Sequence, residues 1–288
     1  MVQTKLQNSS TEGGPTTAGS SARPVTPLGI MVQQLGDAIA LAQTEASAPL
    51  RHALKQVYAL AAGLDPYLES CTTPESDALA SLARKTAAED WSQRFSDQET
   101  VRHLEQEMLS GHIEGQVLKL LVHITQATRV LEVGMFTGYS ALAMAEALPE
   151  AGRVVACEVD AYVAGFARDC FMASPHGHKI QIEVAPALQT LERLVAAQQP
   201  FDLAFLDADK REYIAYFNAL IDGELIAPGG IIAVDNTLLQ GQPYLPADQQ
   251  TANGAAIAEF NRMVAADGRV EQVLLPLRDG LTLIRRKP

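Results

Sequence analysis

The sequence predicts an α/β protein with a doubly wound, mostly parallel sheet of seven strands that ends in an antiparallel C-terminal hairpin. From Arg129 onward, short apolar runs alternate with helical stretches, a pattern typical of a parallel sheet covered on both faces. The last two runs instead flank Arg278-Asp279-Gly280, a turn of the hairpin type. The strands are expected at Val130–Val133, Arg153–Glu158, Ile180–Val184, Leu203–Leu206, Ile231–Val234, Val270–Leu275 and Leu281–Arg285.

Helices are predicted between these strands because apolar residues recur there at helical spacing. They are expected at Ser140–Leu148, Ala161–Met172, Leu188–Ala197, Glu212–Ile221 and Gly254–Ala265.

An N-terminal helical extension precedes the sheet. Its Ala- and Leu-rich pattern runs from Pro27 to about Leu64 and is interrupted at Pro49. Thr73-Pro74-Glu75 combines a cap hydroxyl, a proline and a carboxylate, which predicts a helix from there to about Trp91. Further helices are expected near Leu104–Leu109 and over Ile113–Gln126, the second packing through Val117, Leu118, Leu121 and Ile124.

These patterns divide the chain into three parts. Residues 1–22 are rich in Ser, Thr and Gly and are predicted to be a disordered tail, with a cleaved targeting segment as the alternative. Residues 23–103 form the helical extension, and residues 104–288 form the domain that carries the predicted site.

Composition limits the classes of partner. The chain has 288 residues and a formal net charge of −12, which argues against a nucleic-acid partner because phosphate backbones are bound by dense Lys/Arg surfaces. No apolar run approaches the roughly 20 residues that span a bilayer, so no membrane partner is expected. Cys71, Cys157 and Cys170 are too scattered for a disulfide framework and are predicted to be buried, reduced thiols of a cytoplasmic protein.

A glycine-containing loop between the first strand and its helix predicts a nucleotide-like ligand. In the run Leu131–Ser140, Gly134 and Gly138 allow a sharp turn and a close approach of the backbone to a ligand. Glu158 ends the second strand 20 residues beyond Gly138, where an acid can accept hydrogen bonds from ribose hydroxyls. The sheet is therefore expected to be Rossmann-like, with the ligand at its switch point.

S-adenosylmethionine fits this loop better than a dinucleotide. A dinucleotide site prefers a third glycine near the pyrophosphate, and Phe136 stands at that place. Glu132, expected inside the loop, suits a cationic amino-acid ligand. A nicotinamide-dependent oxidoreductase is one alternative, although no lysine follows Tyr213 or Tyr216 at the spacing of a Tyr-x-x-x-Lys pair. A non-catalytic binding protein that retains the fold is the other.

Polar side chains follow two neighbouring strands of the predicted sheet. Asp207 follows the fourth strand, and Asp235 and Asn236 follow the fifth. Because these positions share the carboxyl edge with the glycine loop, we expect one site of oxygen ligands that suits Mg²⁺, with Ca²⁺ or Mn²⁺ as alternatives. Lys210 lies beside it as a candidate base, or as a solvated residue that pairs with Asp209 or Glu212.

The segments Glu114-Gly115-Gln116, Leu131–Ser140, Asp207–Lys210, Asp235-Asn236-Thr237-Leu238 and Leu277–Thr282 resemble the metal-dependent O-methyltransferases of the caffeoyl-CoA and catechol type. The resemblance covers residues 104–286 and implies that S-adenosylmethionine donates a methyl group to a small molecule with adjacent oxygens. It implies catalysis by Lys210, at the position of the general base, together with Asp207, and it implies a homodimer. The implied metal ligands are Asp207, Asp235 and Asn236, and the implied cofactor-site residues are Ser110, Glu132, Gly134, Ser140, Glu158, Ala187 and Asp207.

A closer resemblance concerns the substrate. Arg23–Gly29, Ala61–Leu68 and Leu104–His112 are similar to the O-methyltransferases of mycosporine-like amino acid biosynthesis. This similarity implies methylation of demethyl-4-deoxygadusol, a cyclohexenone with adjacent enolic and keto oxygens, to 4-deoxygadusol. The plant members of the wider family carry Trp after the Asp-Asn-Thr-Leu segment, where this chain has Leu239-Gln240, and the loop over residues 237–251 is expected to form a wall of the substrate pocket.

Overall fold

The computed structural model describes residues 23–287, so the prediction for residues 1–22 lies outside the described residues. One seven-stranded sheet has the order β3-β2-β1-β4-β5-β7-β6. Strands β1 to β5 are parallel, whereas β7 is antiparallel to β5 and to β6, which confirms the predicted fold class. The strands are β1 (Arg129–Val133), β2 (Arg153–Glu158), β3 (Ile180–Val184), β4 (Phe201–Leu206), β5 (Ile226–Val234), β6 (Val270–Leu275) and β7 (Leu281–Arg286).

Helices cover both faces of the sheet. Side chains of successive strand residues point to opposite faces, so Val130 joins one apolar core and Leu131 the other. The first core is closed by α4 (Asp77–Ala88), α6 (Gly111–Thr125), α7 (Tyr139–Ala147) and α8 (Ala161–Met172). The second is closed by α9 (Ala187–Ala197), α10 (Tyr213–Asp222) and α11 (Ala252–Ala266). Short 3-10 segments connect these elements: η1 (Gln106–Met108), η2 (Gly177–Lys179), η3 (Lys210–Glu212), η4 (Leu239–Tyr244) and η5 (Ala247–Gln249).

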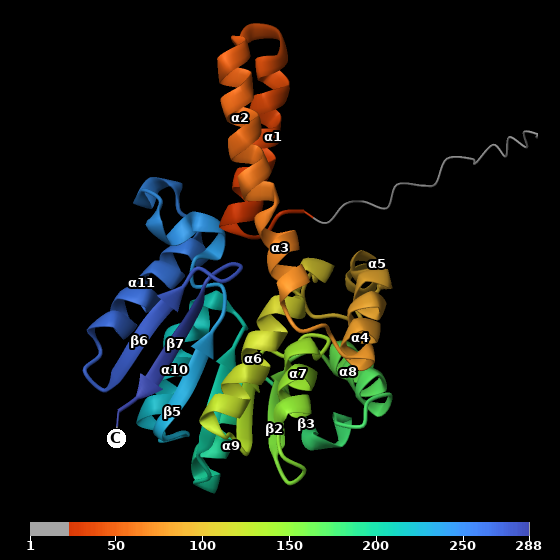
Figure 1. Cartoon of the computed structure of the whole chain (residues 1–288). Helices are drawn as coiled ribbons and strands as arrows, with labels where there is room; N and C mark the ends of the chain where they lie inside the picture. The colour runs from red at the N-terminus through yellow and green to blue at the C-terminus, as the bar shows by residue number, and fades with distance from the viewer. Residues whose placement is uncertain (1–22, 288) are drawn as a thin grey trace, which may run out of the picture.

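The N-terminal extension contains a helical hairpin that stands out from the body of the molecule (Figure 1). It consists of α1 (Pro27–Glu45) and α2 (Ala48–Ala62), and α3 (Leu64–Cys71) leads from it back toward the domain. Thr26 caps α1 by accepting a hydrogen bond from the backbone N–H of Gly29. Neither α2 nor α3 has a buried residue, so this part of the extension adds little to the core.

Several local predictions were wrong. Ser76, not Thr73, caps α4 by accepting from the N–H of Leu79, and the helix ends at Ala88, before Trp91 opens the short helix α5 (Trp91–Ser96). The expected helix near Leu104–Leu109 is only the single turn η1. The side chain of Ile124 is 75% exposed, because the buried face of α6 is formed around Leu118 and Val122. Cys71 is exposed, whereas Cys157 and Cys170 are buried and free as predicted.

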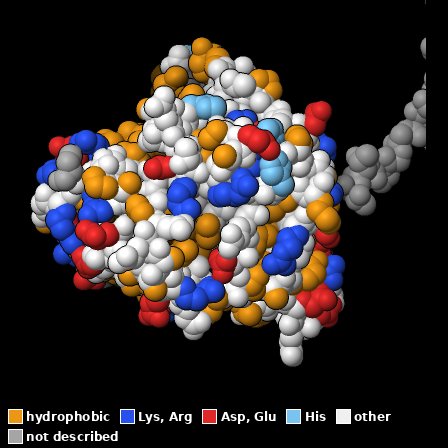
Figure 2. Space-filling view, turned by 90° about the horizontal axis from the view of Figure 1, so that it is seen from below, with side chains coloured by type: hydrophobic (Ala, Val, Ile, Leu, Met, Phe, Trp, Pro, Cys, Tyr) orange, Lys and Arg blue, Asp and Glu red, His pale blue; other side chains and the backbone are white. Residues whose placement is uncertain are grey.

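The described helices include none that is both long enough and apolar enough to cross a membrane. Figure 2 shows the face seen from below, at the end of the sheet where the C-terminus lies. Lys and Arg side chains are scattered on that face among acidic and uncharged ones. The hollow that could take a ligand lies at the other edge.

Candidate functional site

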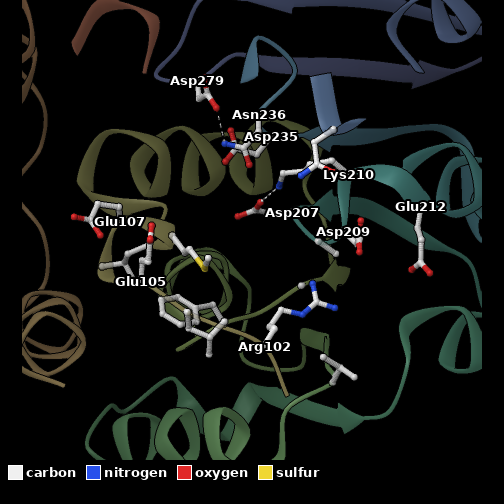
Figure 3. A pocket seen from close by; sticks show the side chains of 18 of the residues that line it. Arg102, Glu105, Glu107, Asp207, Asp209, Lys210, Glu212, Asp235, Asn236 and Asp279 are labelled. Carbon is white, nitrogen blue, oxygen red and sulfur yellow. Dashed lines mark hydrogen bonds and ion pairs between the residues drawn. The ribbon is translucent and has the colours of Figure 1, made fainter. Parts of the chain in front are cut away.

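A cavity of about 730 Å³ opens at the carboxyl edge of the sheet (Figure 3). Gly134 after β1, Glu158 at the end of β2, Asp207 after β4 and Asp235 after β5 all line it. Because β7 runs antiparallel to β5, the turn that precedes β7 lies at the same edge, and Asp279 joins the cavity there. This is where open α/β sheets bind their ligands.

The glycine loop leaves no room for side chains. Gly134 has φ +92°, and a Cβ on it would lie 2.1 Å from the carbonyl oxygen of Asp207. Gly138 has φ +90°, and its Cβ would lie 2.3 Å from the ring of Phe171. The loop is fixed from beneath by the N–H groups of Gly134 and Met135, which both donate to the carbonyl of Cys157. Both glycines are therefore required by packing within the protein, and Gly134 and Phe136 of the loop line the cavity.

Trp91, remote from the loop in sequence, supports it from behind. Its ring lies 5.1 Å from that of Phe136, between ring centroids, and its indole N–H donates to the carbonyl of Thr86. Trp91 is buried and does not line the cavity, whereas Phe136 does. The only tryptophan of the chain therefore packs behind the loop and lies outside the cavity.

Glu158 is held with both carboxylate oxygens occupied. One oxygen accepts from the N–H of Phe136 at 2.9 Å and the other from the N–H of Asp160 at 2.9 Å. Burial raises the pKa of Glu158 to about 7, and these backbone donors act in the opposite direction. The carboxyl group lines the cavity, where it can accept hydrogen bonds from ligand hydroxyls when it is ionised.

Lys210 pairs with Asp207, not with Asp209 or Glu212. Its Nζ donates to Asp207 Oδ1 at 2.8 Å, whereas Asp209 is bound by Arg211. Both side chains are mostly buried and line the cavity. Burial acts to lower the pKa of Lys210, but the charges around it, Asp207 above all, outweigh burial and raise the pKa above its ordinary value.

Asp235 and Asn236 lie together beside Lys210 and Asp207 (Figure 3). Burial, and then the charge of Asp207, raise the pKa of Asp235 above its ordinary value. Asn236 has φ +57°, and its Nδ2 donates to Asp279 Oδ2 at 3.2 Å. The structure therefore brings the predicted ligands Asp207, Asp235 and Asn236 to one side of one cavity.

Two carboxylates and one amide make up that group. Within residues 23–287, no set of three or more His, Cys, Asp or Glu side chains is arranged to hold a metal ion. The predicted set differs in kind, because its third donor is the amide oxygen of Asn236. All three donors are oxygen atoms, the ligand type that Mg²⁺, Ca²⁺ and Mn²⁺ prefer.

Three predicted cofactor residues lie outside the main cavity. Ser110 and Ser140 line a narrow adjoining pocket that shares Gly134 and Asp207 with it. Glu132 was expected in the loop, but it lies in β1, where it is fully buried. Neither carboxylate oxygen of Glu132 has a hydrogen-bond partner among the described residues. Burial raises its pKa well above the ordinary value, and the charges of Asp207 and Glu158 add to that rise. Ala187, at the start of α9, does line the main cavity.

Glu114 and Arg278, to which the sequence patterns assigned no role, form an ion pair in which Glu114 is buried and Arg278 lines the cavity. Glu114 is 1% exposed, and the Nε of Arg278 lies 3.4 Å from its Oε2. Burial, and then the charge of Asp235, raise the pKa of Glu114 well above its ordinary value. Arg278 also donates to the carbonyl of Leu109 and so ties the hairpin turn to the segment before α6. The antiparallel last strand was the signal that could have placed Arg278 at this edge.

The chain before α1 also lines the cavity, which the sequence patterns did not predict. Arg23 forms an ion pair with Glu105, and its backbone N–H donates to Glu107. Val25 and Thr26 then pass along the wall into α1. The loop over residues 237–251 lines the cavity through Leu239 and Gln240, and Asn253 at the start of α11 lines it as well.

The chain is similar to known methyltransferases in sequence and in fold. A family model described as O-methyltransferase matches residues 74–287. Caffeoyl-CoA O-methyltransferase 2 of Zea mays is 38% identical over 195 residues, which span 65% of this chain and 73% of the maize protein. Catechol O-methyltransferase domain-containing protein 1 of Mus musculus is 41% identical over 172 residues, 59% of this chain and 64% of the mouse protein. The crystal structure of the O-methyltransferase TomG from Streptomyces achromogenes, involved in tomaymycin synthesis and in complex with SAM, has a TM-score of 0.65 at 29% identity over 78% of this chain and 96% of that one.

Proposed function

From the premise that the chain belongs to the O-methyltransferase family, as an S-adenosylmethionine-dependent enzyme of the caffeoyl-CoA and catechol type, we propose that it methylates a small molecule whose two adjacent oxygens chelate a divalent cation. The observation that carries this proposal is the meeting of Asp207, Asp235, Asn236 and Lys210 in one cavity with the glycine loop. An oxidoreductase or a non-catalytic protein does not agree with the family.

The electrostatics of the cavity favour a bound cation. Carboxyl groups outnumber cationic groups around Asp207 and Asp235, and burial of several of them makes their mutual repulsion costly. A divalent cation would offset that excess of negative charge. The carboxyl groups concerned are Glu114, Glu132, Asp207, Asp235 and Asp279, and the cations that interact with them are Lys210 and Arg278.

The donor set also fits. Asp207 and Asp235 supply carboxylate oxygens, and Asn236 supplies an amide oxygen because its NH₂ group is already turned to Asp279. We propose Mg²⁺ as the ion in use, since hard oxygen ligands suit it, with Ca²⁺ and Mn²⁺ as substitutes. When bound, the cation would acidify the chelated hydroxyl and, by engaging Asp207, weaken the interaction that raises the pKa of Lys210.

Lys210 is the proposed base. Its amine accepts the proton of the attacking hydroxyl, and the oxyanion forms a bond to the methyl carbon while the bond from that carbon to sulfur breaks. The products are the methyl ether and S-adenosylhomocysteine. Such a site accelerates the reaction mainly by aligning the oxygen, the methyl carbon and the sulfur. The glycine loop and Glu158 hold S-adenosylmethionine for this alignment.

We propose demethyl-4-deoxygadusol as the substrate, because its neighbouring enolic and keto oxygens can chelate one cation. One feature of the cavity wall agrees with a compact, non-aromatic substrate. Leu239 and Gln240 line it at the positions where the plant members carry Trp, so this segment supplies no aromatic surface for a phenylpropanoid. Catechols and caffeoyl thioesters are the alternative, since the maize and mouse relatives are named for such substrates.

One assay tests both levels of the proposal. Transfer of a labelled methyl group from S-adenosylmethionine is measured with demethyl-4-deoxygadusol, a set of catechols and caffeoyl-CoA, with and without a chelator. We expect the highest kcat/KM for the cyclohexenone and no transfer once divalent ions are removed. Full activity in metal-free buffer would refute the cation, and preference for a catechol or the thioester would refute the substrate.

A further inference from the structure

The turn between β6 and β7 packs directly against the segment that carries Asn236. The N–H of Thr237 donates to the carbonyl of Gly280 at 3.0 Å, and the N–H of Leu238 donates to the carbonyl of Asp279 at 2.8 Å. Gly280 has φ +92°, and a Cβ on it would lie 2.5 Å from the backbone nitrogen of Leu238. The two backbones are therefore in contact, and only glycine permits the approach.

Backbone contacts leave the side chain of Asp279 free for two further partners. Its Oδ2 accepts from Nδ2 of Asn236 at 3.2 Å, and its Oδ1 accepts from the backbone N–H of Gln240 at 2.5 Å. The residue is 5% exposed, so water competes little for either bond. One carboxylate thus bridges a proposed metal ligand and a residue of the cavity wall.

The orientation of the Asn236 amide follows from this contact. An ionised carboxylate accepts hydrogen bonds and cannot donate them, so Asn236 must turn its NH₂ group toward Asp279. Its carbonyl oxygen then points away from Asp279, on the side of the amide that is free to coordinate a cation. Without such a partner, the two ends of an amide are nearly equivalent in shape, and the NH₂ end cannot coordinate a cation.

We propose that Asp279 is a positioning residue, which fixes the amide of Asn236 with its oxygen toward the cation and holds Gln240 in the wall of the substrate cavity. This inference rests on the proposed function, because it assigns the device that prepares the metal site. It also predicts that metal binding and substrate binding depend on the same carboxylate.

The sharpest test exchanges the two side chains. In Asp279→Asn the new amide has a single oxygen, which cannot accept from Asn236 and Gln240 as the two carboxylate oxygens do, and its NH₂ group repels that of Asn236. If Asn236 turns over in response, it presents a donor where a ligand oxygen is needed; if the new amide turns over instead, its NH₂ group faces the backbone N–H of Gln240. In the double variant Asn236→Asp/Asp279→Asn, a carboxylate at position 236 offers oxygen at both ends and accepts from the new NH₂ group at position 279. The exchange therefore restores the hydrogen bonds and keeps the net charge.

Binding of Mn²⁺ to the full chain is measured by electron paramagnetic resonance of the free ion, without substrate. We expect the Kd of Asp279→Asn to rise about 10- to 100-fold, as is usual when a group that orients a metal ligand is lost. The exchanged double variant should recover most of that affinity. In activity assays, Asp279→Asn should also raise the KM of the substrate, because Gln240 loses its fixed position.

A matched control is Asp267→Asn at the far end of the same hairpin. Asp267 also accepts several hydrogen bonds, from Arg269, but it does not line the cavity. This variant should bind Mn²⁺ as the wild type does, and urea unfolding of each variant in metal-free buffer shows whether the fold is intact.

The outcomes separate the two proposals. Failure of the wild type to bind Mn²⁺ would refute the cation site, and with it the proposed function. Binding by the wild type with an unchanged Kd for Asp279→Asn would refute the inference alone. A folded Asp279→Asn that loses Mn²⁺ binding without recovery in the exchanged variant would also overturn it, because loss of charge or packing would then explain the effect.

Discussion

Replacement of Gly134 by alanine tests whether the glycine loop and the metal edge form one rigid unit. The added Cβ would lie 2.1 Å from the carbonyl oxygen of Asp207, and distances under 3.0 Å essentially never occur for a Cβ. The loop and the end of β4 must therefore separate by roughly 1 Å, and overpacking of this kind typically costs about 1–3 kcal/mol of stability. The left-handed backbone at φ +92° adds about 1–2 kcal/mol for a residue with a Cβ.

The effect on catalysis should exceed the effect on folding. Asp207 is a proposed metal ligand, and a misplacement of about 1 Å in a catalytic site can lower the rate about 100-fold. The free energy of unfolding is measured by urea titration, and methyl transfer is measured at saturating S-adenosylmethionine. Gly165→Ala in α8 is the matched control, because nothing lies within 4 Å of the added Cβ. That control should gain about 0.5–1 kcal/mol from its helical position and keep its rate. If Gly134→Ala were as stable and as active as the wild type, the close contact described here would be wrong.

Three further perturbations probe the cavity. Lys210→Met should lower kcat about 100-fold or more while Mn²⁺ binding stays measurable, and a near-normal rate would reassign the base; Lys55→Met on α2 is its control. Since the pKa of Glu158 is raised to about 7, protonation below that pH removes its charge. The affinity for S-adenosylhomocysteine, measured by calorimetry, should therefore rise about tenfold between about pH 6 and about pH 8. Glu158→Gln should abolish that slope, and an equal slope in the variant would assign it to another group. Arg23→Ala removes the ion pair with Glu105, so it should raise the substrate KM with less than about 1 kcal/mol lost in stability, and an unchanged KM would show that this wall does not contact the substrate.

Local patterns predicted the sheet and its helices well, because hydrophobic periodicity and helix capping depend on residues that are close together in the sequence. The helix Ala161–Met172 has its predicted bounds, and Asp160 caps it by accepting from the N–H groups of Tyr162 and Val163. The start of α4 was misplaced because Thr73 and Ser76 both carry cap hydroxyls, and sequence alone does not decide which one faces a helix end. β5 begins earlier than predicted, at Ile226, because Pro228-Gly229-Gly230 interrupts the apolar run without ending the strand.

Some residues of the site could also be predicted from local patterns, whereas others depend on how distant strands pair. Asp207, Asp235 and Asn236 could be predicted to meet, because parallel strands bring their carboxyl ends to one edge. Glu132 was expected in the loop although it falls within the predicted strand Val130–Val133, and the pairing of β1 with β2 and β4 shows that it lies in the interior. The sequence predicted Asp279 to lie in a turn. Its contact with Asn236, 43 residues earlier, depends on the pairing of β5 with β7.

Among the strands of the sheet, β7 comes last in the chain, yet it lies inside the sheet and not at its border. β7 is inserted between β5 and β6, so the neighbours of β7 emerge from the ribosome before it does. Until Leu281–Arg286 pairs with β5, Asp279 has no fixed place beside Asn236. A nascent chain at that stage contains the glycine loop and the ends of β4 and β5, but Asp279 does not yet orient the amide of Asn236. Such distant pairing is slow to form because a long loop must first close. The site is therefore complete only after Leu281–Arg286 has been translated, and a chain that ends before β7 is expected to have no active centre.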